Sequence, residues 1–311
     1  MKTAVLLANI GSPSAPEPAA ARSYLRAFLS DPAVVPLPRL PRIAFARTVS
    51  FLRAPRLARA YRRIRREGEG APLPACMEAL ADALADRLDR PVKAGLLFGV
   101  PSMADATASL LEAGAEEILL LPLFPQASPV TDRACAAAVR RALHGRARLR
   151  IAPPFFDHPA YIRLAARQIP SDPGFLLFSF HALPLRLDDA VDPPYSEQCR
   201  RTARLVAEAA GIPSDRWAVA FQSRFGPGRW LRPRTRDLLR DLPRRGEKKL
   251  TVYCPGFFCD GLETLDEIGR RGRAVFLEAG GRDFRLLPCP GADPRAAEFL
   301  EQLLDNLIPK G

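Results

Sequence analysis

Short apolar runs alternate with helix-length segments along nearly the whole chain, and this alternation is the feature that most restricts the fold. Eight runs have the length and composition of buried strands: 3–9, 92–98, 117–123, 149–155, 174–181, 217–222, 250–254 and 284–288. Segments between them place apolar residues near the helical period of 3.6: 74–88, 102–113, 132–143, 195–210 and 295–306. Strands that alternate with helices build parallel sheets from βαβ units, so we expect an α/β protein.

The chain is long enough for two packed cores. It has 311 residues, of which 48% are hydrophobic, and single cores stop growing at about 250–300 residues. Four predicted strands in each half predict two similar lobes. We place the join at the proline-bearing stretch 153–159, which gives an N-terminal domain 1–155 and a C-terminal domain 156–311. A cleft between lobes is the expected ligand site, and the last helix is a candidate to pack back on the first lobe.

A basic, amphipathic stretch covers residues 39–66. It contains ten arginines and no acidic residue, with apolar side chains interleaved, in a chain whose formal net charge is +12. Nucleic acid, an anionic membrane surface, or an acidic and apolar ligand would each fit such a stretch. A solvated helix face is the fourth interpretation, because the chain favours arginine throughout.

Several function classes lack their sequence signatures. No uncharged apolar run is long enough to span a bilayer, and the N-terminus does not resemble a signal peptide, so we expect a cytoplasmic protein. The six cysteines are scattered and include no Cys-x-x-Cys pair. The sequence therefore shows neither the spacing of a zinc finger nor the disulfide framework of a secreted protein. The glycine-rich fingerprints for dinucleotides and nucleoside triphosphates are missing, which argues against a nucleotide-dependent redox enzyme or ATPase.

Two ionisable side chains follow strand-like runs, where open α/β sheets collect their chemistry. His181 comes directly after the apolar run 175–180. At this position a histidine can be a core residue whose hydrogen bonds are satisfied, or it can act as a base or metal ligand. Glu263 lies with Asp260 and Glu267 at the start of a predicted helix, at spacings that place all three carboxylates on one face. On the residues alone, helix capping by Asp260 and Glu263 is favoured over a carboxylate track for a divalent cation.

Six blocks of sequence occur in an order that is typical of one enzyme family. Two of them are the most diagnostic: SFHALP at 179–184 and CPGFFCDGLETL at 254–265. The others are LLANIGSP at 6–13 with YLRAFLSDP at 24–32, YRRI to GAPL at 61–73, LPLFPQAS at 121–128, and FQSRFG to WL at 221–231. Taken together, they make the chain resemble ferrochelatase nearly end to end. That family inserts ferrous iron into a porphyrin late in haem synthesis.

The resemblance implies two Rossmann-like lobes, each a four-stranded parallel sheet flanked by helices, with a porphyrin cleft between them. His181 and Glu263 would face each other across that cleft. His181 would remove pyrrole protons and contact the metal, whereas Glu263 would deliver the metal or remove protons. Asp260 and Glu267 would extend an acidic track. The positions that resemble porphyrin contacts are Ile10, Phe98, Ser128, Trp230 and Phe257.

The resemblance also bears on partners and cofactors. Residues 39–66 fall where the family carries a hydrophobic lip at the pocket mouth, which implies contact with porphyrin or lipid and makes nucleic acid the least favoured partner. Leu97 and Phe98 stand where many members have arginine and tyrosine, so that edge of the ring must be held differently. No cysteine-bearing tail follows the last helix, and Pro129 replaces a cluster cysteine. We therefore expect no [2Fe-2S] cluster and no permanently bound cofactor, with Fe²⁺ as a substrate.

The amino-acid sequence of the motifs favours protoporphyrin IX as the porphyrin and protohaem as the product. Coproporphyrin III is the alternative substrate. A haem- or porphyrin-binding protein that has lost catalysis is an alternative function, because of Leu97 and Phe98. A cobalt or sirohydrochlorin chelatase is the third hypothesis, although those relatives are shorter and richer in histidine than this chain, which has three. Oligomeric state and peripheral membrane attachment stay open at this level.

Overall fold

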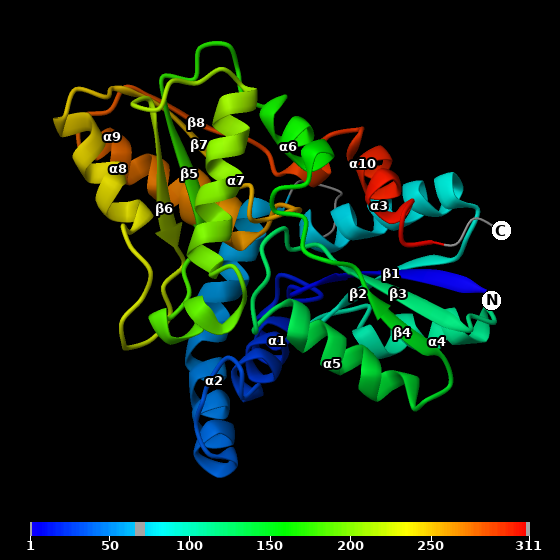
Figure 1. Cartoon of the computed structure of the whole chain (residues 1–311). Helices are drawn as coiled ribbons and strands as arrows, with labels where there is room; N and C mark the ends of the chain where they lie inside the picture. The colour runs from blue at the N-terminus through cyan, green and yellow to red at the C-terminus, as the bar shows by residue number, and fades with distance from the viewer. Residues whose placement is uncertain (1, 66–71, 309–311) are drawn as a thin grey trace. The chain divides into compact units, whose positions relative to one another are not determined.

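The computed structural model describes residues 2–65 and 72–308, and the chain divides into two compact units (Figure 1). Unit 1 comprises Met1–Leu123, Pro129–Pro153 and Leu304–Gly311, and unit 2 comprises Phe124–Ser128 and Pro154–Leu303. Parts of two predicted features lie outside the described residues. They are Arg66 of the basic stretch, and Gly70 and Ala71 of the block that begins at Tyr61.

Unit 1 is built on a four-stranded parallel sheet in the order β2-β1-β3-β4. Its strands are β1 (Thr3–Asn9), β2 (Val92–Leu96), β3 (Glu117–Pro122) and β4 (Arg148–Ile151). Its helices are α1 (Pro18–Ser30), α2 (Arg39–Ile64), α3 (Pro72–Leu88), α4 (Met103–Glu112) and α5 (Asp132–Leu143). The central strands β1 and β3 are buried along their whole length, which explains their continuous apolar sequence.

Unit 2 repeats this plan, with a parallel sheet in the order β6-β5-β7-β8. Its strands are β5 (Phe175–His181), β6 (Trp217–Gln222), β7 (Lys249–Tyr253) and β8 (Asp283–Leu286). Its helices are α6 (Pro159–Ala166), α7 (Tyr195–Ala209), α8 (Thr235–Arg244), α9 (Arg273–Glu278) and α10 (Ala296–Leu304). The 3₁₀ turns η1 (Leu185–Ala190) and η3 (Pro290–Ala292) and the π-helix η2 (Glu263–Gly272) complete the unit.

The predicted fold class, two four-stranded parallel sheets flanked by helices, is confirmed. The predicted strand 92–98 is too long at its carboxyl end. It stops at Leu96 because the chain turns back there, so that the Leu96 amide donates to the Pro101 carbonyl oxygen at 2.9 Å. The six cysteines are free thiols, and five of them are buried, as expected of small apolar side chains.

The long helix α2, which contains most of the basic stretch, packs on α1 through small side chains. Its buried positions include a row spaced four residues apart: Ala46, Ser50, Ala54 and Ala58. Ala21 of α1 packs against the last two. The large apolar side chains lie outside this contact, and Leu40, Phe51 and Leu52 are 78%, 60% and 69% exposed. Within residues 2–65 and 72–308, no helix has the length and apolar character needed to cross a bilayer.

Candidate functional site

The carboxyl ends of the central strands of unit 2 carry most of the predicted site residues. Strand β5 ends at His181, which is in register with Gln222 at the end of the neighbouring β6. On the other side of β5, strand β7 ends at Tyr253, and the chain then runs to Glu263 at the start of η2. Parallel strands end at the same edge of a sheet, so both ionisable residues belong to unit 2 and to one edge of it.

The contacts of His181 determine which of its ring nitrogens is free. Its Nδ1 lies 2.7 Å from the carbonyl oxygen of Ala182. A carbonyl oxygen can only accept, so Nδ1 carries the proton in this hydrogen bond and a neutral imidazole keeps its lone pair on Nε2. The hydroxyl of Tyr195 donates to the His181 carbonyl oxygen at 3.0 Å, and the ring of Phe257 lies 6.3 Å from the imidazole between centroids. The geometry therefore offers Nε2 as a base or metal ligand.

The carboxyl group of Glu263 is shifted towards its protonated form. Burial is the main cause that raises its pKa above the ordinary value of 4.5, and the nearby Glu267 carboxylate raises it further. A local backbone hydrogen bond, His181 and Arg271 act in the opposite direction. The electrostatic effect of His181 on this pKa indicates that the imidazole lies near the carboxyl group. Such a carboxyl group takes up and releases protons closer to neutral pH than an exposed glutamate does.

Glu263 opens a π-helix rather than the ordinary helix that the sequence predicts. In η2 the backbone bonds reach one residue further than in an α-helix, which widens each turn. One ion-pair cluster fits this wider turn, because Asp266 accepts from Arg270 Nε at 2.6 Å and from Arg271 Nε at 2.9 Å. Residues four and five positions away share a face in the wider helix, whereas an α-helix would separate them. Hydrophobic periodicity over so few residues does not distinguish the two helices. Short π-helical segments are frequent at functional sites.

A buried polar network beneath the site holds the start of η2. Gln222 Nε2 donates to the Glu263 carbonyl oxygen at 2.8 Å, and Gln222 Oε1 accepts from Ser179 Oγ at 2.5 Å. Ser179 Oγ also lies 2.7 Å from Thr235 Oγ1. The sequence reasoning did not single out Gln222. Its signal is a long polar side chain that ends the apolar run 217–221 in a central sheet.

Asp260 makes contacts that differ from the helix capping predicted for it. Its carboxylate accepts from Thr264 Oγ1 at 2.7 Å and from the Cys289 amide at 3.1 Å. The residue that caps η2 is Leu262, which makes no side-chain capping bond, so the predicted capping box of Asp260 and Glu263 is wrong. The chain has not yet entered the helix at Asp260, which therefore ties the loop after β7 to the loop after β8.

Glu267 lies four residues after Glu263 and is held by a clamp at the end of β6. Its two carboxylate oxygens accept from the Ser223 amide at 2.9 Å and from Ser223 Oγ at 2.7 Å. Ser223 has a φ of 62°, a left-handed conformation that turns the chain after β6. In residues 2–65 and 72–308, no group of three or more His, Cys, Asp or Glu side chains could hold a metal ion. His181 and Glu263 are the candidate metal ligands at this edge.

Three of the predicted porphyrin contacts also belong to unit 2. Trp230 is half-buried and forms an isolated antiparallel bridge with Pro184, three residues beyond His181. Phe257 is half-buried beside the His181 ring. Ser128 is buried in the short segment that unit 2 takes from the first half of the chain. The structure thus brings Phe257 to His181 and places Trp230 in a loop that contacts the strand end.

The other two predicted contacts, Ile10 and Phe98, belong to unit 1. The Phe98 amide donates to the Ile10 carbonyl oxygen at 2.8 Å. The Phe98 ring is only 8% exposed and packs edge-on against Phe28, with ring centroids 5.4 Å apart. Ile10 is half-buried. Phe98 therefore contributes to the core of unit 1, and Ile10 offers more surface to a ligand than Phe98 does.

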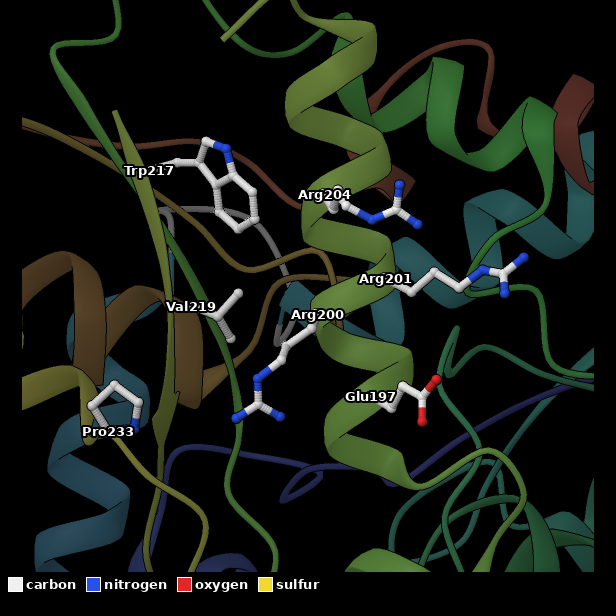
Figure 2. A pocket seen from close by; sticks show the side chains of 7 residues that line it. All are labelled: Glu197, Arg200, Arg201, Arg204, Trp217, Val219 and Pro233. Atoms are coloured by element: carbon white, nitrogen blue, oxygen red, sulfur yellow. The ribbon is translucent and has the colours of Figure 1, made fainter. Parts of the chain in front are cut away.

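A hollow of about 480 Å³ between α7 and β6 contains none of the predicted site residues (Figure 2). It is lined by Glu197, Arg200, Arg201, Arg204, Trp217, Val219 and Pro233. Figure 2 shows Arg201 and Arg204 extending from the side of α7 away from Trp217. Arg201 pairs with Asp157 at 2.8 Å, and Arg204 pairs with Glu208 at 3.1 Å. Two of its three cations are therefore already neutralised by the protein.

Comparisons with known proteins match the chain to one family. The ferrochelatase family model matches residues 2–307. Ferrochelatase of Klebsiella pneumoniae (strain 342) is 40% identical over 316 residues, which cover 97% of each chain. Ferrochelatase of Actinobacillus pleuropneumoniae serotype 5b (strain L20) is 39% identical over 320 residues, 99% of each chain. Among solved structures, SirB from Bacillus subtilis with Fe³⁺ has a TM-score of 0.59 at 13% identity, over 98% of this chain and 95% of that one, a likeness of fold alone.

Proposed function

Since the chain belongs to the ferrochelatase family and is a metal chelatase that inserts iron into a porphyrin, we propose that its substrates are Fe²⁺ and protoporphyrin IX. We further propose that His181 and Glu263 perform the insertion, which makes protohaem and releases two protons. The observation that carries this proposal is the location of both residues at the carboxyl-end edge of one sheet. One has a free imidazole nitrogen, and the other has a carboxyl pKa raised by burial.

Proton removal is the first task of such a site. The two pyrrole N–H protons of the free porphyrin must leave as the metal enters, and each needs an acceptor within hydrogen-bonding reach. His181 Nε2 carries the lone pair of the neutral imidazole and can accept one of these protons. Glu263, whose pKa is raised, accepts a proton more readily than an exposed glutamate and is suited to pass it on. The two protons balance the two positive charges of the incoming iron.

Metal delivery is the second task. Imidazole nitrogen and carboxylate oxygen are both suitable ligands for ferrous iron, and a site with only two of them binds it weakly enough to release it to the ring. The network from Ser179 through Gln222 to the Glu263 carbonyl oxygen fixes the backbone from which the carboxylate projects. Positioning of this kind matters because the reacting groups must already be aligned when the ring binds.

The choice of protoporphyrin IX rests on the amino-acid sequence of two motifs, residues 221–224 and 254–257. Coproporphyrin III, which carries four carboxylates in place of two, is the alternative that the experiment must separate. Ile10, Ser128, Trp230 and Phe257 are the proposed contacts of the ring, whereas Phe98 is a core residue of unit 1.

Anaerobic metal insertion assays test the proposal directly. Purified protein is mixed with Fe²⁺ and protoporphyrin IX, coproporphyrin III or sirohydrochlorin, and the absorbance change of the ring is followed. We expect turnover with protoporphyrin IX, and loss of turnover with retained ring binding in His181→Ala and Glu263→Gln. Full activity in both variants would refute the site assignment. Faster turnover of coproporphyrin III would refute the substrate, and ring binding without any turnover would support a binding protein.

We also propose that the protein is cytoplasmic and that α2 contacts an anionic membrane surface peripherally. The support is the packing of α2, which buries small residues and leaves Leu40, Phe51 and Leu52 exposed among arginines. Exposed apolar side chains beside cations favour the interface of an anionic bilayer, where both parts find partners.

A further inference from the structure

The peptide group that joins His181 to Ala182 is hydrogen-bonded at both of its ends. Its carbonyl oxygen accepts from the hydroxyl of Tyr195 at 3.0 Å. Its amide, which belongs to Ala182, donates to the carbonyl oxygen of Gln222 at 2.8 Å. A peptide group is planar, so two bonds at opposite ends fix the orientation of the whole group. The backbone just after strand β5 is therefore held by the neighbouring strand β6 and by helix α7.

This fixed peptide group supports the carbonyl oxygen that bonds to the His181 ring. Nδ1 of His181 lies 2.7 Å from the carbonyl oxygen of Ala182. The next carbonyl oxygen, that of Leu183, accepts from the Leu231 amide at 3.0 Å. The Ala182 carbonyl group thus lies between two fixed points of the backbone. Because the bond at Nδ1 decides which ring nitrogen carries the proton, the tautomer with Nε2 unprotonated depends on this short stretch of backbone.

Tyr195 is itself held in place by the start of its helix. It is the first residue of α7 and is only 6% exposed. The residue before the helix, Pro194, makes no side-chain capping bond. Instead, the carboxylate of Asp188 accepts from the Ser196 amide at 2.7 Å and from Ser196 Oγ at 2.8 Å, where the free amides of a helix favour an anion. Two neighbouring residues of α7 thus hold the two ends of segment 181–188.

The bond from Tyr195 differs in kind from the bonds made by Gln222 and Leu231. Those two join backbone atoms and do not depend on the side chains, whereas the Tyr195 bond is made by a phenol hydroxyl. A carbonyl group that loses such a donor is held less firmly, and a buried carbonyl without a partner is unfavourable.

We propose that Tyr195 is a positioning residue for His181. Its hydroxyl holds the peptide group after the histidine and thereby keeps the imidazole in the orientation and the tautomer that leave Nε2 unprotonated. The inference rests on the proposed function, in which His181 takes up a pyrrole proton.

The test combines steady-state metal insertion with NMR of the histidine rings. Tyr195→Phe removes the hydroxyl and keeps the ring that fills the buried position. Tyr161→Phe is the matched control, because Tyr161 is also buried in unit 2 and its hydroxyl also donates to a backbone carbonyl oxygen, that of Pro255. The chain has three histidines, so ¹⁵N-labelled histidine gives few ring signals. His144→Gln and His158→Gln assign these signals by loss.

The ¹⁵N shifts of a neutral imidazole report which nitrogen carries the proton. In the unmodified protein we expect a single His181 tautomer, with the proton on Nδ1. In Tyr195→Phe we expect a mixture of the two tautomers and a kcat about tenfold lower, since a displacement of about 1 Å can reduce a rate about a hundredfold and two backbone bonds remain. The KM for porphyrin should change by less than about twofold. Tyr161→Phe should lose similar stability in urea unfolding and keep both the single tautomer and kcat.

Four results would overturn the positioning role. Protonation of His181 on Nε2 in the unmodified protein would do so without any variant, even if Tyr195→Phe failed to fold. A single Nδ1-protonated tautomer in Tyr195→Phe, an unchanged kcat despite mixed tautomers, or equal kcat losses in Tyr195→Phe and Tyr161→Phe would do so as well.

The same measurements separate this inference from the proposed function. If removal of the Tyr195 hydroxyl mixes the His181 tautomers but the unmodified protein inserts no iron, the positioning of the ring stands and the proposed function fails. If iron insertion requires His181 while Tyr195→Phe matches the unmodified protein in tautomer and kcat, the proposed function stands and the positioning role fails.

Discussion

Replacing Gln222 by methionine should reduce turnover through the backbone of Glu263. The substitution keeps the length of the side chain and removes both the donor to the Glu263 carbonyl oxygen, at 2.8 Å, and the acceptor of Ser179 Oγ, at 2.5 Å. Each buried hydrogen bond contributes about 0.5–1.5 kcal/mol net, so the free energy of unfolding should fall by about 2 kcal/mol. Ser179 keeps Thr235 as a partner, which limits the loss.

The catalytic effect should exceed the effect on stability. Without Gln222 the first residue of η2 loses its tie to β6, and displacement of a reacting group by about 1 Å can reduce a rate about a hundredfold. We expect kcat to fall at least tenfold while the KM for porphyrin changes little, because the Gln222 side chain bonds to Ser179 and Glu263 rather than to the proposed ring contacts. The assay is steady-state metal insertion together with urea unfolding.

A matched control uses another buried glutamine of unit 2. Gln198 accepts from the Ala127 amide at 2.8 Å and donates to the Pro193 carbonyl oxygen at 2.6 Å, so Gln198→Met loses two bonds of the same kind. It should lose similar stability and retain kcat, with any change confined to KM because Ala127 precedes the proposed contact Ser128. Equal kcat losses in both variants, or an unchanged kcat in Gln222→Met, would refute the positioning role.

Three further predictions concern charge and surface. The raised pKa of Glu263 means that the folded protein binds the carboxyl proton more tightly than the unfolded chain does. Protonation of Glu263 therefore stabilises the fold fully below pH 4.5, and this stabilisation is lost as the pH rises through the folded pKa. Glu263→Gln should therefore be more stable than the unmodified protein at pH 7 in urea unfolding, with the difference shrinking towards pH 5. Glu267→Gln removes a like charge that raises the Glu263 pKa, so the acid limb of the pH–rate profile should move to lower pH. An acid limb that stays at the same pH or moves to higher pH would contradict this prediction. Phe51→Ser with Leu52→Ser should reduce cosedimentation with anionic vesicles severalfold without lowering kcat, whereas equal cosedimentation would exclude α2 as the contact.

Much of the fold was predictable because it is encoded locally. A strand in the middle of a parallel sheet is buried on both faces and must be apolar along its whole length, as β1 and β5 are. Edge strands carry less of this signal, and β4 and β8 are partly exposed. Their ends were accordingly placed less well than those of the central strands β1 and β3. The positions of His181 and Glu263 after strands β5 and β7 could also be predicted, since strand ends can be located from the same pattern.

The parts of the site that could not be predicted depend on contacts between distant segments. The residues alone favoured a capping box for Asp260 and Glu263, but Asp260 bonds instead to the amide of Cys289, which follows β8. The π-helical geometry of η2 could not be predicted from the sequence either, because the α-helical and π-helical periods differ too little over ten residues. Burial, which sets the pKa of Glu263, exists only once the sheet and η2 have packed.

The sequence by itself determined that this chain forms two parallel sheets, that it belongs to the ferrochelatase family, and that a histidine and a glutamate follow neighbouring strands. Only the tertiary structure decided that Gln222 holds the Glu263 backbone and that Tyr195 holds the His181 carbonyl oxygen. The physical reason is the range of the interactions. Periodicity and strand ends are set by neighbours in sequence, whereas hydrogen-bond partners are set by the strand order β6-β5-β7-β8, which brings together segments some 40 residues apart.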